Sequence, residues 1–129
     1  MLNISVSEHL TFSGPIKLLN HNVKVNADAY TPTDQDGVPT GSITPVTSKS
    51  PFYMGKWRAL GAAVTRIYRH QVAHSVVSGG HQPPPDGLAV NFVAKTSRNN
   101  RFLARVQDNK SGRFVQVASN QPCLQLQTC

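Results

Sequence analysis

Acidic residues are scarce in this sequence. Six aspartates and glutamates stand against 13 lysines and arginines, which gives a net charge of +7. Nucleic-acid-binding proteins usually concentrate such charge in one patch that also holds aromatic residues. Here the basic residues are spread along the chain, with local groups only at 66–69 and 98–105. The second group alternates with apolar residues, which predicts arginines on a solvated strand face. Nucleic acid is therefore not favoured as a partner.

Cysteines and long apolar runs are also few. With only Cys123 and Cys129, and no histidine close to them, the chain lacks a zinc ligand set, and we interpret both as free thiols; a disulfide is the alternative. No run approaches the roughly 18 apolar residues of a membrane-spanning helix. The first ten residues lack the basic and apolar segments of a secretory signal. These absences predict a cytoplasmic protein without a membrane span.

Nine glycines and nine prolines are spread along the chain. Such frequent punctuation is typical of short strands joined by turns, so we expect a mainly β protein. The length of 129 residues leaves room for one domain, at 1–129. Period-two alternation predicts strands at 23–27, 101–107, 114–118 and 124–127, and a short apolar run predicts another at 88–93.

Loops and turns are marked by glycine, proline and aspartate. Residues 108–112 predict a hairpin loop that ends in glycine. The stretch 30–51 holds four prolines and predicts a long loop with at most a short extended piece at 42–44. Asp34 and Asp36 beside Gly37 predict a turn rather than a cation site.

One segment, 56–76, has apolar residues at helical spacing and is the single helix that we expect. Its spacing places Trp57 in the core, although stacking on a sugar is an alternative. His70 and His74 lie four residues apart within it, but no acidic residue accompanies them. We interpret them as surface histidines and predict no metal site.

Two segments resemble the galactose mutarotase (aldose 1-epimerase) family. Residues 27–34 read Ala-Asp-Ala-Tyr-Thr-Pro-Thr-Asp and are followed at 38–46 by Val-Pro-Thr-Gly-Ser-Ile-Thr-Pro-Val. Residues 111–113 are Ser-Gly-Arg, and 120–128 read Asn-Gln-Pro-Cys-Leu-Gln-Leu-Gln-Thr. Order and approximate spacing agree with the family's motifs, and the likeness is poor only at about 53–86.

The resemblance implies a partial antiparallel β-sandwich, because the family's domain is about twice this length or more. It also implies a hexose, galactose or glucose, as the partner, and neither a metal nor an organic cofactor. In the family, a glutamate and a histidine open the sugar ring by general acid–base catalysis. The glutamate lies downstream of the last motif, so we expect this chain to be an inactive fragment.

Individual positions follow from the same resemblance. The catalytic histidine position falls on Ser7, and a shift of two residues would place His9 there instead. The family's aspartate and the histidine after it are replaced by Ala89 and Val90. The sugar-contacting glutamine is retained as Gln125, which is equally explained as one polar residue of an alternating strand.

Two alternatives remain open at this point. The chain is either an aldose 1-epimerase relative with little or no turnover, or a non-catalytic β-sandwich module that binds a carbohydrate or a protein. A sandwich that lacks strands exposes sheet edges. We expect 102–104 and 124–126 to lie at such edges and to promote self-association.

Overall fold

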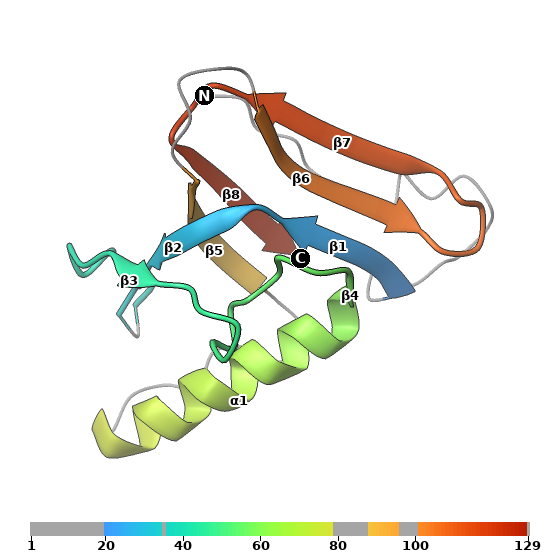
Figure 1. Cartoon of the computed structure of the whole chain (residues 1–129). Coiled ribbons are helices and arrows are strands. Elements are labelled where there is room, and N and C mark those ends of the chain that lie inside the picture. Colours follow the sequence, from blue (N-terminus) through green and yellow to red (C-terminus); the bar gives the residue numbers. More distant parts are fainter. Residues whose placement is uncertain (1–19, 35, 79–87, 96–100, 129) are drawn as a thin grey trace.

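The computed structural model describes residues 20–34, 36–78, 88–95 and 101–128. These residues form two antiparallel four-stranded sheets and one helix (Figure 1). The first sheet has the order β4-β1-β6-β7, with bounds Arg58–Ala59, His21–Val25, Arg101–Asp108 and Phe114–Ser119. The second has the order β3-β2-β5-β8, with bounds Thr44–Pro45, Ala27–Thr31, Leu88–Ala94 and Cys123–Thr128. The predicted β architecture is confirmed.

The chain passes from one sheet to the other at Asn26, where the single strand predicted at 23–27 is interrupted. The Asn26 backbone N–H donates to the Leu103 carbonyl at 2.8 Å. Its side-chain Nδ2 donates to the Phe102 carbonyl at 3.2 Å. The Asn26 carbonyl accepts a hydrogen bond from Lys95 at 3.4 Å. Asn26 therefore bonds to both sheets, and these long-range bonds divide the predicted strand into β1 and β2.

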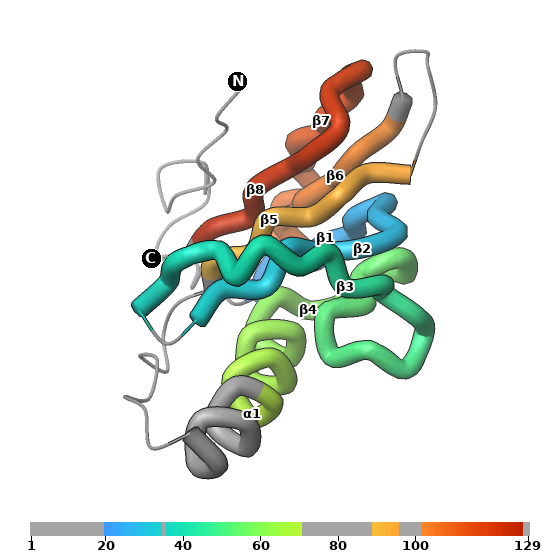
Figure 2. Tube along the Cα trace, turned by 90° about the vertical axis from the view of Figure 1, so that its left-hand side faces the viewer, coloured from blue at the N-terminus to red at the C-terminus, as the bar shows by residue number. Residues whose placement is uncertain are grey.

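The core lies between the two sheets and the helix α1 (Leu60–Ser78). Figure 2 shows α1 beneath the strands, with β2, β5 and β8 side by side. One face of the helix buries Leu60, Val64 and Ile67 against inward-facing strand residues such as Val23 and Phe92. This burial gives the amphipathic helix its stability in the fold.

The helix begins four residues later than predicted, and Trp57 is not a core residue. Arg58 and Ala59 pair with β1 as the short strand β4, so their backbones follow the sheet rather than the helix. Trp57 precedes this strand and is 43% exposed. The prediction that Trp57 packs in the core was therefore wrong. Because residues 58–59 pair with β1 as a strand, the helix does not extend back to Trp57, and the helical spacing behind the prediction does not apply to it.

The segment between β3 and β4 supplies two core side chains that periodicity did not indicate. Phe52 and Met54 are both buried. The Phe52 ring stacks on Tyr30, with centroids 4.0 Å apart, and the Met54 carbonyl accepts a bond of 2.7 Å from the Val25 N–H. The residues that follow the predicted loop therefore pack against the strands and lead into β4 and α1.

The sheet edges differ from the expectation in one place. Residues 102–104 belong to β6, which pairs with β1 on one side and β7 on the other. The expectation of an edge there was wrong, and a bulge between Phe102 and Ala104 also interrupts the predicted alternation. Residues 124–126 lie in β8, which pairs with β5 only among the described strands. No helix in the described part of the chain is long and apolar enough to cross a membrane.

Both predicted turns are confirmed by their hydrogen bonds. The Asp34 side-chain oxygen Oδ1 accepts from the backbone N–H groups of Asp36 and Val38, each at 2.9 Å. In the hairpin between β6 and β7, the Asp108 carboxylate accepts from the N–H groups of Lys110 and Ser111. Gly112 has a φ of 73°, which side chains rarely tolerate, so glycine suits the end of this loop.

Candidate functional site

The outward face of the second sheet carries a row of polar side chains. Alternation along β5 turns Val90 and Phe92 into the core and leaves Asn91 on the opposite face. Asn91 is paired with Thr31 of β2 and with Gln125 of β8. Residues paired across antiparallel strands share a face, so Thr31, Asn91 and Gln125 form a polar row across three strands.

Hydrogen bonding within the row orients its central amide. Asn91 Nδ2 donates to Thr31 Oγ1 at 3.0 Å, which leaves the Asn91 side-chain oxygen as an acceptor. Gln125 is exposed on the edge strand β8 and adds an amide with both a donor and an acceptor. A sugar hydroxyl both donates and accepts, so neighbouring amides of this kind match its hydrogen-bonding needs.

The row next to this one contains Ala89 and Gln127, which pair across β5 and β8. Ala89 lies on the same face as Asn91, because the two positions are two residues apart in one strand. It is exposed and presents a methyl group where the resemblance to the family places an aspartate. Val90, where the resemblance to the family places a histidine, is 4% exposed and packs in the core.

The predicted site residues are only partly within the described structure. Gln125 lies on the polar row, beside Asn91. His9 and Ser7 lie outside the described residues. Asn91 and Thr31 were not predicted as site residues, because their proximity to Gln125 depends on strand pairing. Alternation would have placed Asn91 and Ala89 on one face, but it does not reveal which strand lies beside them.

The polar row is electrically neutral. Its amides and hydroxyl do not ionise near neutral pH. On the opposite face, burial raises the pKa of the Tyr30 phenol, and a hydrogen bond with Thr44 partly offsets this. Among the described residues no group of three or more histidine, cysteine, aspartate or glutamate side chains is placed to hold a metal ion. Cys123, at the start of β8, is an exposed free thiol.

A second cluster, of one arginine and two aromatic side chains, lies on the first sheet, and packing of these side chains on one another explains it. The Arg105 guanidinium carbon is 3.6 Å from the centroid of the Phe114 ring and 5.5 Å from that of Trp57. Arg105 is half-buried, and its Nε is buried without a hydrogen-bond partner. A solvated strand face was predicted for the arginines of 98–105; Arg105 is only partly solvated, because two aromatic rings lie against its side chain.

Comparisons with known proteins identify a family and similar sequences. The sequence model of the aldose 1-epimerase family matches residues 1–129. The galactose mutarotase of Mus musculus is 30% identical over 129 residues, and the match covers 97% of this chain and 33% of that protein. The galactose mutarotase of Homo sapiens is 30% identical over 109 residues, covering 84% of this chain and 27% of that protein. The chain thus spans about a third of the length of such relatives.

A solved structure shows the same fold. The crystal structure of an aldose epimerase homologue from C. elegans aligns with a TM-score of 0.60 and 18% sequence identity. The alignment covers 82% of this chain and 27% of that one. The structural likeness shows the fold, and the family model that matches residues 1–129 shows the family. The chain belongs to the aldose 1-epimerase family.

Proposed function

We propose that this chain binds a hexose through the polar row of Thr31, Asn91 and Gln125 and does not itself interconvert the anomers. The observation that carries the proposal is the strand register, which places Gln125 directly beside Asn91. Gln125 is the position that the resemblance to the family assigns to sugar contact. The relatives named galactose mutarotase make galactose the first hexose to test.

The chemistry of the row supports binding rather than turnover. Opening a sugar ring needs one group that donates a proton and another that accepts one. The row offers amides and a hydroxyl, whose pKa values lie far from neutrality. Ala89 has no carboxylate, and the resemblance to the family places Ser7 at the catalytic histidine position, or His9 after a shift of two residues.

The first prediction concerns galactose binding. Titration of the purified chain with galactose, followed by NMR of the side-chain amides, is expected to shift the signals of Gln125 and Asn91. Gln125→Ala removes one donor and one acceptor and should weaken binding by about tenfold, the loss expected for roughly one to two hydrogen bonds. Gln116→Ala is the matched control, because Gln116 is an exposed strand glutamine in the other sheet.

Three outcomes would count against this proposal. Equal losses for the two glutamine variants would remove Gln125 from the binding face. Failure of galactose to shift any signal would favour a protein-binding module.

Mutarotation of fresh α-D-galactose, followed by polarimetry, should proceed at the rate of the buffer blank. Acceleration in proportion to protein concentration would show a catalyst and would make His9→Ala the next variant.

We also propose that β8 pairs with a second copy of the chain. Leu124 and Leu126 are half-buried on its inner face, and β8 has a pairing partner on one side only among the described strands. Such an edge favours strand addition. Sedimentation equilibrium should show a concentration-dependent increase in mass, and Leu126→Lys should reduce it by placing a charge at the edge. A monomer at all concentrations would contradict this prediction.

A further inference from the structure

Most of the net positive charge falls in one continuous part of the chain. Residues 37–85 contain no aspartate or glutamate, and they include five basic residues, namely Lys49, Lys56, Arg58, Arg66 and Arg69. The remaining residues hold eight basic and six acidic side chains. Five of the seven net charges therefore come from this segment, which includes the loop before β4 and all of α1. The excess arises because acidic residues are absent from the segment, whereas basic residues are about as frequent there as in the rest of the chain.

Two of these arginines meet at one backbone atom. Arg58 Nε donates to the Tyr53 carbonyl oxygen at 3.1 Å, and Arg66 Nη2 donates to the same oxygen at 3.1 Å. The two nitrogens can thus be no further apart than twice that distance. Arg66 Nε also donates to the Pro51 carbonyl at 2.8 Å. Arg58 comes from β4 and Arg66 from α1, so the pair marks the junction of strand, loop and helix.

No carboxylate compensates this pair of charges within the described residues. The Arg58 guanidinium carbon lies 6.0 Å from the centroid of the Tyr53 ring, which is its one additional favourable contact there. Burial lowers the pKa of Arg66, and the positive charge of Arg58 lowers it further. Arginine guanidinium groups carry a positive charge in proteins at neutral pH. Two like charges held this close favour the approach of an anion.

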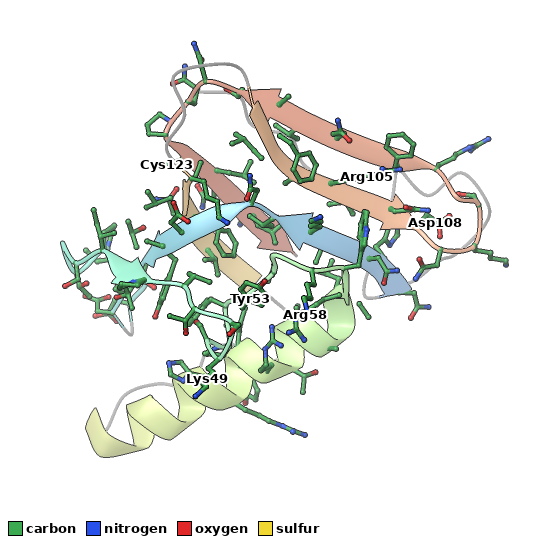
Figure 3. All side chains as sticks on the ribbon, viewed as in Figure 1. Lys49, Tyr53, Arg58, Arg105, Asp108 and Cys123 are labelled. Atoms are coloured by element: carbon green, nitrogen blue, oxygen red, sulfur yellow. The ribbon has the colours of Figure 1, made fainter. Side chains whose placement is uncertain are left out.

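The hydrogen bonds to the loop leave several donors unused. Among the described residues, Arg58 donates a hydrogen bond through Nε alone, so its two terminal nitrogens keep their protons available there. Arg66 uses Nε and Nη2 and keeps Nη1. A guanidinium presents its donors in a planar fork that matches the oxygens of phosphate. In Figure 3, Arg58 and Tyr53 lie next to the first turns of α1.

We infer that Arg58 and Arg66 form a binding site for a phosphate-class oxyanion at the junction of β4, the preceding loop and α1. The unused guanidinium protons bind the oxyanion, and exposed Lys49 and Arg69 add attraction at longer range. The site is separate from the polar row, which lies on another face and carries no charge. The two proposals therefore succeed or fail independently.

A purely structural role for the two arginines makes a different prediction. In that case the two arginines only hold the loop in place, by donating hydrogen bonds to the Pro51 and Tyr53 carbonyls. Their positive charges then bind no ligand. A structural pair would respond to phosphate and to chloride equally at matched ionic strength. A phosphate site would respond to phosphate specifically, because only that ion fits the fork of donors.

Isothermal titration with inorganic phosphate, at constant ionic strength set with chloride, tests the inference. The chain should bind phosphate, and NMR signals of the Arg58 and Arg66 Nε–H groups should shift during the titration. Arg58→Gln keeps the two Arg66 bonds to the loop and should raise the Kd by about tenfold, the loss of one charge-assisted interaction. Lys110→Gln removes the same charge from the exposed β6–β7 hairpin and should change the Kd by less than about twofold.

Arg66→Lys provides a second variant that keeps the charge and loses the fork. This variant should bind phosphate more weakly than the wild type. Titration with chloride should give the same result for both proteins. Equal Kd values for Arg58→Gln and the wild type would overturn the inference, as would the absence of phosphate binding. Tight, steeply salt-dependent binding of single-stranded DNA without phosphate binding would also overturn it, since that result indicates a diffuse polyanion surface.

Discussion

Replacing Phe92 by alanine is expected to reduce the free energy of unfolding by about 3–5 kcal/mol. Phe92 is 1% exposed and is among the largest fully buried side chains of the described residues. It lies in β5 between Tyr30 of β2 and Leu124 of β8. Removing the ring leaves a cavity where the second sheet contacts the rest of the core. Domains of this size have about 5–15 kcal/mol of stability in total, so the variant is expected to be only marginally folded.

Urea denaturation followed by circular dichroism measures this change. Phe114→Ala is the matched control, because Phe114 is the same residue type on a strand and is 54% exposed. It loses its contact with the Arg105 guanidinium, which is expected to cost about 0.5–1 kcal/mol. Similar losses for the two variants would show that Phe92 is not the centre of a packed core.

Acidification is expected to destabilise the chain through Asp108. The hydrogen bond from the Ser111 side-chain hydroxyl lowers the pKa of this carboxyl most. The backbone N–H groups of Lys110 and Ser111 and the charge of His21 lower it further. The residue as a whole is buried, and desolvation opposes the shift. A carboxyl with a lowered pKa in the folded state stabilises that state above its ordinary pKa of 3.8. This contribution is lost as the pH falls through the lowered value.

Thermal unfolding between neutral pH and pH values below the ordinary pKa of aspartate tests this expectation. The wild-type melting temperature should fall on acidification, and Asp108→Asn should show a lower melting temperature at neutral pH and a shallower fall. Asp36→Asn is the control, because Asp36 is exposed and its backbone N–H, rather than its carboxylate, takes part in the turn. Parallel curves for the wild type and Asp108→Asn would assign the acid sensitivity to other groups.

The candidate site was only partly predictable. Gln125 was identified because it stands in a short motif whose resemblance to the family can be read along the chain. Asn91 and Thr31 are 34 and 94 positions away from Gln125 in the sequence. Only the pairing of β2, β5 and β8 brings the three together. The arginine pair was missed for the same reason, because Arg58 and Arg66 meet through the carbonyl of a third residue.

The sequence by itself determined the family, the mainly β composition and the local turns. The turn at Asp34 and the hairpin at Asp108 depend on side chains that bond to backbone groups within four residues, so their signals are local. Tertiary structure decided where elements begin and end. The interruption at Asn26 and the start of α1 after β4 arise from hydrogen bonds with distant strands. Such bonds outweigh local periodicity, because a buried backbone group must find a partner wherever the fold supplies one.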